Sequence, residues 1–203
     1  MEYQNEKMTM EYYNGNATRF YQDTIRVEFS EIQKNFTQYL SQGARILDFG
    51  CGSGRDSKAF LDQGYQVDSL DGSEEMCKLA EKLTGQSISQ MRFQDFEETS
   101  YYDGIWACAS LLHLEPEELK EVLLHLYNAL KMDGYLYASF KYGEFTGIRN
   151  GRYFTDMTQE NLMEIVQSVG GFETVDIQIS TDARPGRDDE KWINIILRKT
   201  TSR

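Results

Sequence analysis

Cysteine is scarce in this sequence, with three residues in 203, at positions 51, 77 and 108. Cysteines so few and so widely spaced exclude a disulfide framework and a zinc site of the usual ligand spacing. The chain begins Met-Glu-Tyr-Gln-Asn-Glu-Lys, which has neither the basic nor the apolar region of a signal peptide. We therefore predict a reduced, cytoplasmic protein that holds no metal.

Long apolar runs and an excess of positive charge are also missing. No run approaches the ~20 residues of a membrane helix, so we expect no membrane partner. Lysine and arginine number 21 against 33 aspartates and glutamates, which gives a formal net charge of −12. Because non-specific nucleic-acid binding depends on neutralising phosphates, this charge argues against a nucleic-acid partner.

The remaining composition is that of a folded domain, with 40% hydrophobic and 13% aromatic residues. A length of 203 residues suits a single domain and is too short for two large ones. Residues 1–16 are polar and tyrosine-rich, and we expect them to be mobile or to form a lid. Apolar residues then recur at helical spacing over 25–40, which predicts a helix that ends near Gly43.

Strand and helix patterns alternate along the rest of the chain. Strands are predicted at 45–49, 66–71, 89–93, 104–107 and 135–140, and helices at 54–63, 74–84, 116–130 and 162–169. Two final strands, at 174–179 and 192–197, have no helix between them and should pair antiparallel. The expected fold class is α/β: a Rossmann-like, doubly wound sheet of seven strands, mostly parallel, with an antiparallel C-terminal hairpin at one edge and helices on both faces.

The most informative segment is Ile-Leu-Asp-Phe-Gly-Cys-Gly-Ser-Gly-Arg-Asp, residues 46–56. A strand here leads into a turn whose glycines leave the backbone open to a ligand. Asp48 would repel a pyrophosphate, whereas it would attract an ammonium or a sulfonium. The segment therefore favours S-adenosylmethionine over NAD or ATP.

The other predicted strands end in residues that suit the same ligand. Ligands of open α/β sheets bind outside the carboxyl ends of the strands. The second strand ends in Asp71, at the separation from the glycine loop where a carboxylate usually meets ribose hydroxyls. Gln94, Asp95 and Phe96 follow the third strand, and Cys108 follows the fourth.

These segments resemble class I S-adenosylmethionine-dependent methyltransferases over residues 44–141. The resemblance rests on Leu-Asp-Phe-Gly-Cys-Gly-Ser-Gly, Leu-Asp-Gly-Ser, Phe-Gln-Asp-Phe and Tyr-Asp-Gly-Ile-Trp-Ala-Cys-Ala-Ser-Leu-Leu-His. It is closest to small bacterial enzymes of the tellurite-resistance or generic methyltransferase type. It implies S-adenosylmethionine as cofactor. We expect one domain of three parts: a lid or covering helix (1–42), a cofactor-binding core (44–141), and a segment with the acceptor-side loops, the last helix and the C-terminal hairpin (142–203).

The resemblance also implies roles for single residues. Asp48 and the glycine loop would hold the methionine moiety, Asp71 the ribose, and Asp95 the adenine amino group. The residues expected to bind the cofactor are Tyr13, Tyr21, Asp48, Gly50, Cys51, Gly52, Arg55, Asp71, Gly72, Ser73, Met76, Gln94, Asp95, Phe96, Cys108 and Ala109.

A sulfonium is already activated, so methyl transfer requires alignment more than acid–base machinery. His113 follows the fourth strand and is either a general base or a packing residue under the next helix. Tyr12, Tyr13 and Tyr21 are either a lid that excludes water or an ordinary aromatic patch.

Arginines gather in two late segments of this acidic chain, at positions 149, 152, 184 and 187. Arg149, Arg152 and Arg184 are our candidates for binding an anionic acceptor through bidentate contacts. The alternative is that these charges are solvated and paired with neighbouring acids such as Asp188.

The predicted function is therefore in-line methyl transfer to a small-molecule acceptor, by a monomer or a homodimer. Three alternatives stay open: an RNA or protein methyltransferase, a module that binds S-adenosylmethionine without turnover, and a dinucleotide-dependent oxidoreductase. The last is disfavoured because Arg55 stands where a dinucleotide-binding loop wants its third glycine.

Overall fold

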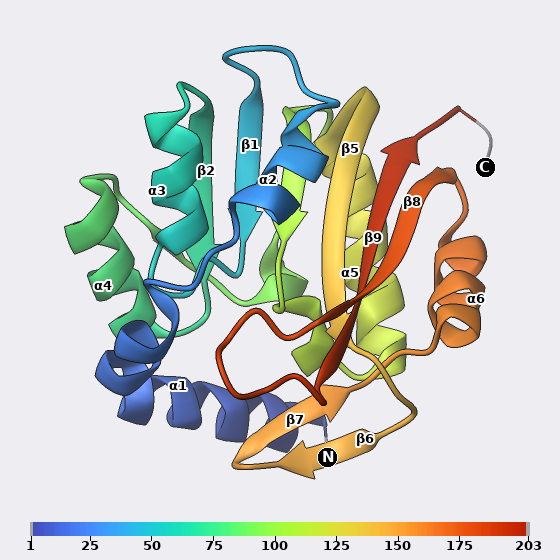
Figure 1. Cartoon of the computed structure of the whole chain (residues 1–203). Coiled ribbons are helices and arrows are strands. Elements are labelled where there is room, and N and C mark those ends of the chain that lie inside the picture. The colour runs from blue at the N-terminus through green and yellow to red at the C-terminus, as the bar shows by residue number, and fades with distance from the viewer. Residues whose placement is uncertain (1, 202–203) are drawn as a thin grey trace.

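A seven-stranded sheet forms the centre of the protein, in the order β3-β2-β1-β4-β5-β9-β8 (Figure 1). The structure is a computed structural model that describes residues 2–201, and the side chains of residues 4–201. The strands of the sheet are β1 (Arg45–Phe49), β2 (Gln66–Asp71), β3 (Ser89–Gln90), β4 (Tyr102–Ala107), β5 (Leu130–Lys141), β8 (Phe172–Thr181) and β9 (Lys191–Lys199).

The pairing of the strands confirms the predicted fold class. β1 pairs in parallel with both β2 and β4, and β4 pairs in parallel with β5. β9 runs antiparallel to β5 and to β8, so the final two strands form a hairpin at one edge. The chain moves outward from β1 in both directions, and at such a point the carboxyl ends of the strands leave a crevice for a ligand.

Helices cover both faces of the sheet. On one face, Phe36 and Phe60 pack against the fully buried Trp106, with ring centroids 5.4 and 5.3 Å away. On the other face, α5 and α6 close a larger apolar core around β4 and β5. The helices are α1 (Glu2–Thr24), α2 (Ser30–Thr37), α3 (Arg55–Asp62), α4 (Glu74–Thr84), α5 (Pro116–Ala129) and α6 (Gln159–Val169), with 3-10 turns η1 (Phe93–Asp95) and η2 (Leu111–His113).

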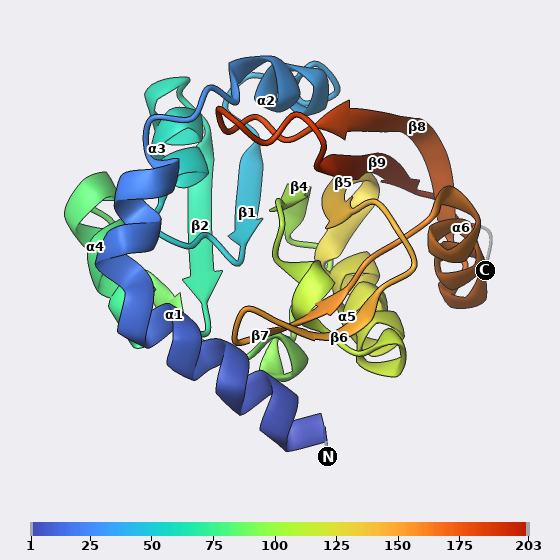
Figure 2. The same cartoon turned by 60° about the horizontal axis from the view of Figure 1, so that its bottom comes forward.

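The N-terminal segment forms one long helix, α1, over residues 2–24, where residues 1–16 were expected to be mobile or to form a lid. The helix predicted over 25–40 is limited to Ser30–Thr37. Figure 2 shows α1 crossing in front of the carboxyl ends of β1 and β2, with α4 on one side and the β6–β7 region on the other. Its few inward residues, including the buried Thr9 and Ala17, are held by contacts with the rest of the fold.

The segment after β5 also differs, because it forms a second small sheet. β6 (Thr146–Arg149) and β7 (Arg152–Thr155) pair antiparallel around Asn150 and Gly151. Both turn residues have positive φ, 52° and 77°, and Asn-Gly is the dipeptide that favours such a two-residue hairpin. The third strand is shorter than predicted, since Phe93 already belongs to the turn η1.

None of the helices within residues 2–201 combines the length and the apolar character that a membrane crossing requires.

Candidate functional site

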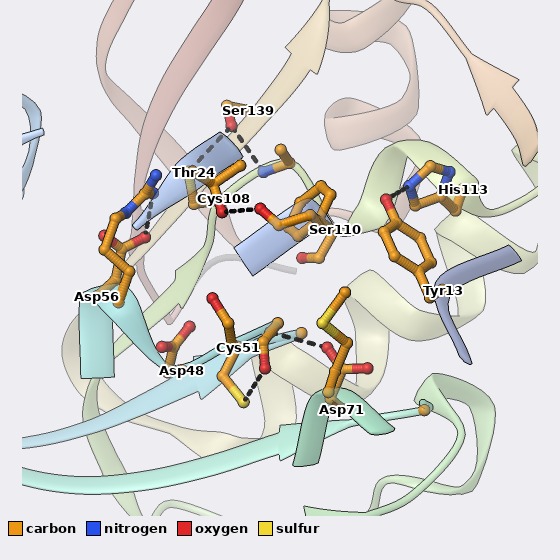
Figure 3. Close-up of a pocket in the computed structure, with 18 of the residues that line it drawn as sticks. Tyr13, Thr24, Asp48, Cys51, Asp56, Asp71, Cys108, Ser110, His113 and Ser139 are labelled. Carbon is orange, nitrogen blue, oxygen red and sulfur yellow. Dashed lines mark hydrogen bonds and ion pairs between the residues drawn. The ribbon is translucent and has the colours of Figure 1, made fainter. Parts of the chain in front are cut away.

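A cavity lies between α1 and the carboxyl ends of β1, β2 and β4 (Figure 3). Its walls come from the glycine loop, the end of β2, the segments after β3 and β4, α1, and the loop between β8 and β9. The predicted residues that line it are Tyr13, Asp48, Gly50, Cys51, Gly52, Arg55, Asp71, Gly72, Met76, Gln94, Cys108, Ala109, His113 and Arg184.

The glycine loop is held open by its backbone. Gly50 and Cys51 donate their N–H groups to the carbonyl of Leu70, at 3.0 and 2.9 Å. Gly50 has φ +82°, and a Cβ there would lie 2.4 Å from Cβ of Ser110. Gly52 has φ +54°, but the nearest atom to a Cβ there is 3.8 Å away, on Phe20 of α1. Gly50 is therefore packed, whereas Gly52 faces open space.

Asp48 is the penultimate residue of β1, and its side chain is buried. Its carboxylate accepts a hydrogen bond from the hydroxyl of Ser57, which also contacts Ser69 at 2.9 Å. Burial, with a smaller contribution from the nearby charge of Asp56, raises the pKa of Asp48 to about 8. A cation bound in the cavity would favour the ionised form.

Asp56, at the start of α3, anchors the opposite side of the loop. It accepts two hydrogen bonds from Arg55 at 2.9 Å, one from Trp106 at 2.9 Å and one from Gln33 at 2.8 Å. Burial alone would raise the pKa of Asp56, but the Arg55 guanidinium and these hydrogen bonds lower it below its usual range. Arg55 is thus committed to Asp56 and also lies over the ring of Phe29, at 3.8 Å from its centroid.

Asp71 ends β2 on the far side of the glycine loop. One carboxylate oxygen accepts from the N–H of Gly52 and the other from the N–H of Ser73, both at 2.8 Å. Burial raises its pKa, and the two backbone donors oppose that shift. Each oxygen keeps a lone pair for a further donor from the cavity.

Four of the predicted cofactor residues do not line the cavity. Ser73 caps α4 by accepting from the N–H of Met76, and its hydroxyl donates to Asn14 of α1. Asp95 is exposed at the end of η1, because this turn directs its side chain outward. Phe96 packs in the core at 5.4 Å from Phe49, and Tyr21 is also not among the lining residues.

The wall beside Gly72 is formed instead by residues that sequence reasoning missed. Met10 of α1 lies over Gly72, where an added Cβ would be 2.7 Å from its sulfur. The ring of Phe93 stacks on Phe49 at 4.4 Å between centroids and borders the cavity. The α1 residues in the lining recur at helical spacing, but the segment is polar, so no apolar pattern marked them in the sequence: Glu6, Thr9, Met10, Tyr13, Phe20 and Thr24.

α1 is attached on both sides of the cavity. On one side, the amide oxygen of Asn14 accepts from the Ser73 hydroxyl at 2.7 Å. On the other, Glu6 pairs with Arg92, and the Thr9 hydroxyl accepts from the N–H of Tyr153 at 3.0 Å. α1 therefore forms one wall of the cavity and is fixed to the rest of the fold by these contacts.

His113, at the end of η2, is connected to α1 by Tyr13. Its Nδ1 lies 2.6 Å from the carbonyl of Tyr153, and its Nε2 lies 2.8 Å from the Tyr13 hydroxyl. A carbonyl only accepts, so Nδ1 carries the proton and Nε2 accepts from Tyr13. Burial lowers the pKa of His113 to about 4, so the ring is neutral at neutral pH.

The two cysteines that line the cavity are poor nucleophiles, because burial raises the pKa of Cys108 to about 12 and that of Cys51 well above its usual value.

The segment that contains the glycine loop is similar to known proteins. Residues 47–136 match a family described as a methyltransferase domain. A protein of Geobacillus sp. (strain WCH70) named as a methyltransferase is 36% identical over 115 residues, which cover 53% of this chain and 47% of that protein. The chain thus spans about half the length of this relative. The Bacillus subtilis (strain 168) protein YqeM, also named as a methyltransferase, is 27% identical over 176 residues, covering 81% of this chain and 70% of YqeM.

The arrangement in space is shared more widely. The 1,6-didemethyltoxoflavin-N1-methyltransferase of Burkholderia thailandensis, solved with 1,6-didemethyltoxoflavin and S-adenosylhomocysteine, has a TM-score of 0.80 to this structure. The alignment covers 98% of this chain and 91% of that protein at 20% identity, a level at which the likeness shows the fold.

Proposed function

We propose that this chain is a class I S-adenosylmethionine-dependent methyltransferase, which binds S-adenosylmethionine and methylates a small molecule. Its match to a methyltransferase domain over residues 47–136 and its fold support this proposal. The observation that carries the proposal is the placing of a buried carboxyl, Asp48, and a half-buried one, Asp71, on either side of the glycine loop, beneath α1. Figure 3 shows Asp48, Cys51 and Asp71 on one wall, Cys108 and Ser139 on another, and Tyr13 with His113 on a third.

The residues of the cavity suit the parts of this cofactor. Asp71 keeps an acceptor on each oxygen for the two hydroxyls of a ribose. Met76, Met10 and Phe93 offer apolar and aromatic surface for an adenine, and Gln94 offers polar groups at its edge. The open space at Gly52 and the carboxyl of Asp48 would receive the methionine end with its ammonium.

The charge of the ligand fits the state of Asp48. A carboxyl with a pKa of about 8 is largely protonated at neutral pH. Asp48 therefore repels the neighbouring carboxylates of Asp56 and Asp71 little while the cavity holds no cation. A nearby ammonium or sulfonium stabilises the carboxylate and lowers its pKa. Binding of the cofactor should therefore release a proton from Asp48.

The reaction needs little from the protein beyond position. S-adenosylmethionine supplies a methyl group on a sulfonium that is already a good leaving group. The cavity walls align the acceptor with that group, and α1 excludes water. For an acceptor that must lose a proton, we propose that the Tyr13 hydroxyl takes it while passing its own proton to Nε2 of His113. The Tyr153 carbonyl at Nδ1 stabilises the imidazolium so formed.

A small acceptor agrees with the covered cavity and with the net charge of −12. The B. thailandensis protein that shares this fold was solved with a small heterocycle.

Calorimetric titration with S-adenosylhomocysteine and, separately, with NADH tests the cofactor. We expect binding of S-adenosylhomocysteine only. Asp71→Ala should weaken it at least tenfold, since a carboxylate that accepts from a ligand contributes about 1.5–3 kcal/mol. Asp62→Ala, on the exposed side of α3, is the matched control and should leave the affinity unchanged. Binding of NADH, or equal affinities for the two variants and the wild type, would refute the cofactor assignment.

A further inference from the structure

A second cavity adjoins the first and shares a wall with it. Tyr13, Phe20, Ala109, His113, Arg184 and Trp192 line both cavities. The second cavity extends from this shared wall to the β6–β7 hairpin and the loop after β8. It therefore continues from the end of the first cavity that Ala109 and Cys108 line. An acceptor would enter from this side.

Most arginines around these cavities are neutralised within the protein. Arg149 makes two hydrogen bonds to Asp156, at 2.7 and 3.0 Å. Arg184 donates through Nε to Asp182 at 2.8 Å, and the carboxyl of Asp182 is almost completely buried. Arg187 pairs with Glu190 at 3.3 Å. Two of our three candidates, Arg149 and Arg184, therefore already hold a carboxylate of this chain.

Arg152 is different, because it has no carboxylate partner in the part of the chain that the structure describes. Its Nη1 donates to the Tyr13 hydroxyl at 3.2 Å, and its Nε is buried without a hydrogen-bond partner. The guanidinium lies 4.5 Å from the ring centroid of Tyr12 and 5.0 Å from that of Phe154. Ring faces stabilise a cation, but they do not accept the hydrogen bonds of a guanidinium.

A partly buried cation without a counterion is costly unless a ligand supplies one. The walls around Arg152 also restrict the shape of that ligand, since rings predominate among the apolar residues of the second cavity: Tyr13, Phe20, Tyr142, Phe154 and Trp192. Rings bind flat aromatic groups by stacking. We infer that Arg152 binds the anionic group of a flat aromatic acceptor.

This inference rests on the proposed function and names the acceptor class for the same site. The anion would lie at Arg152 and the aromatic ring against the shared wall, beside the Tyr13 hydroxyl. Since Tyr13 already accepts from Arg152 and donates to His113, an acceptor held there reaches the proposed proton-accepting pair directly.

Fragment binding to the full chain, saturated with S-adenosylhomocysteine, tests the inference. The probes are benzoate, its neutral analogue benzamide, and the non-aromatic anion cyclohexanecarboxylate, each titrated by ligand-observed NMR. Wild type should bind benzoate about tenfold more tightly than benzamide, because a charge-assisted, bidentate contact is stronger than a neutral one. It should also bind benzoate more tightly than cyclohexanecarboxylate, which carries the same charge but cannot stack on the rings. Arg152→Met should remove the preference for benzoate over benzamide, and Arg152→Lys should retain part of it.

Arg187→Met is the matched control, because Arg187 lines the same cavity and is already paired with Glu190. It should keep the full preference. Arg152 does not line the first cavity, so every variant should bind S-adenosylhomocysteine like wild type, and loss of that binding in wild type would count against the proposed function instead. Equal binding of benzoate and benzamide by wild type, no binding of any probe, or an unchanged preference in Arg152→Met would overturn the inference.

Discussion

Replacing Gly50 by alanine should destabilise the fold, whereas replacing Gly52 should mainly weaken cofactor binding. The two glycines belong to one loop and both have positive φ, +82° and +54°. Their surroundings differ: a Cβ at Gly50 would meet Cβ of Ser110 at 2.4 Å and the Phe93 ring at 2.9 Å. A Cβ at Gly52 would point into the cavity, with Phe20 at 3.8 Å as its nearest neighbour.

The magnitudes follow from these contacts. A left-handed backbone costs a residue with a Cβ about 1–2 kcal/mol, and this applies to both variants. Forcing extra volume into a packed site adds roughly 1–3 kcal/mol at Gly50 alone. Gly50→Ala should therefore lower the free energy of unfolding by about 2–5 kcal/mol, and Gly52→Ala by about 1–2 kcal/mol. The larger loss is a substantial part of the ~5–15 kcal/mol that holds a typical domain folded.

Urea unfolding followed by circular dichroism measures the stabilities, and calorimetric titration with S-adenosylhomocysteine measures binding at a temperature where both variants are folded. We expect Gly52→Ala to lose at least about tenfold in affinity, since its methyl group occupies the space assigned to the methionine end. The reasoning fails if Gly52→Ala is as destabilised as Gly50→Ala, or if it binds S-adenosylhomocysteine as tightly as wild type does.

Three further predictions concern charges around the cavity. Asp56→Asn should lower the free energy of unfolding by about 3–5 kcal/mol, because the mostly buried Arg55 loses its counterion. Urea titration should show a loss of at most ~0.5 kcal/mol for Asp62→Asn, which changes an exposed residue. Similar losses for both variants would refute this prediction. Acidification from pH 6.5 to 5 should destabilise wild type by roughly 2 kcal/mol through His113, because its pKa is about 4 in the folded protein against 6.5 ordinarily, so the unfolded chain binds the proton first. His113→Gln should lack this part of the slope in urea titrations at both pH values, and a slope equal to that of wild type would contradict it. The affinity for S-adenosylmethionine should rise between pH 6 and 7.5, because Asp48, with a pKa of about 8, must ionise on binding. Calorimetry should find the same affinity at both pH values for Asp48→Asn. A wild-type affinity that stays constant or falls over this range would exclude the coupling of binding to ionisation of Asp48.

The sequence predicted the centre of the sheet closely because its signals there are local. β1 and β2 occupy the predicted ranges, 45–49 and 66–71. Each has an acid at or next to its last residue and is followed directly by glycine, so its carboxyl end is marked within a few residues. Ser73 caps α4, and Gly85 ends it with φ +71°, as the same kind of local reasoning predicted.

α1 was not predictable from local signals. The segment is polar, and its inward residues are held by partners far away in sequence, such as His113 for Tyr13 and Tyr153 for Thr9. Such a helix is stabilised mainly by tertiary packing, which neither composition nor propensity reveals. The same contacts bring Tyr13 and Met10 into the cavity. Which residues of α1 line the cavity therefore could not be predicted without the rest of the fold.

Three arginines on the acceptor side differ in their tertiary contacts, which the sequence does not show. The sequence placed Arg149, Arg152 and Arg184 together and gave no reason to distinguish them. Arg149 lies opposite Arg152 beside the turn of the β6–β7 hairpin, and its side chain reaches Asp156, which follows β7 at the open end of the hairpin. Arg152 points to Tyr13 instead and has no carboxylate partner among the described side chains, residues 4–201. Strand pairing brings the two arginines together but does not distinguish them, because they face each other in the same ladder. Their partners distinguish them, and the contact of Arg152 with Tyr13 of α1 is a tertiary contact that residue type alone does not reveal.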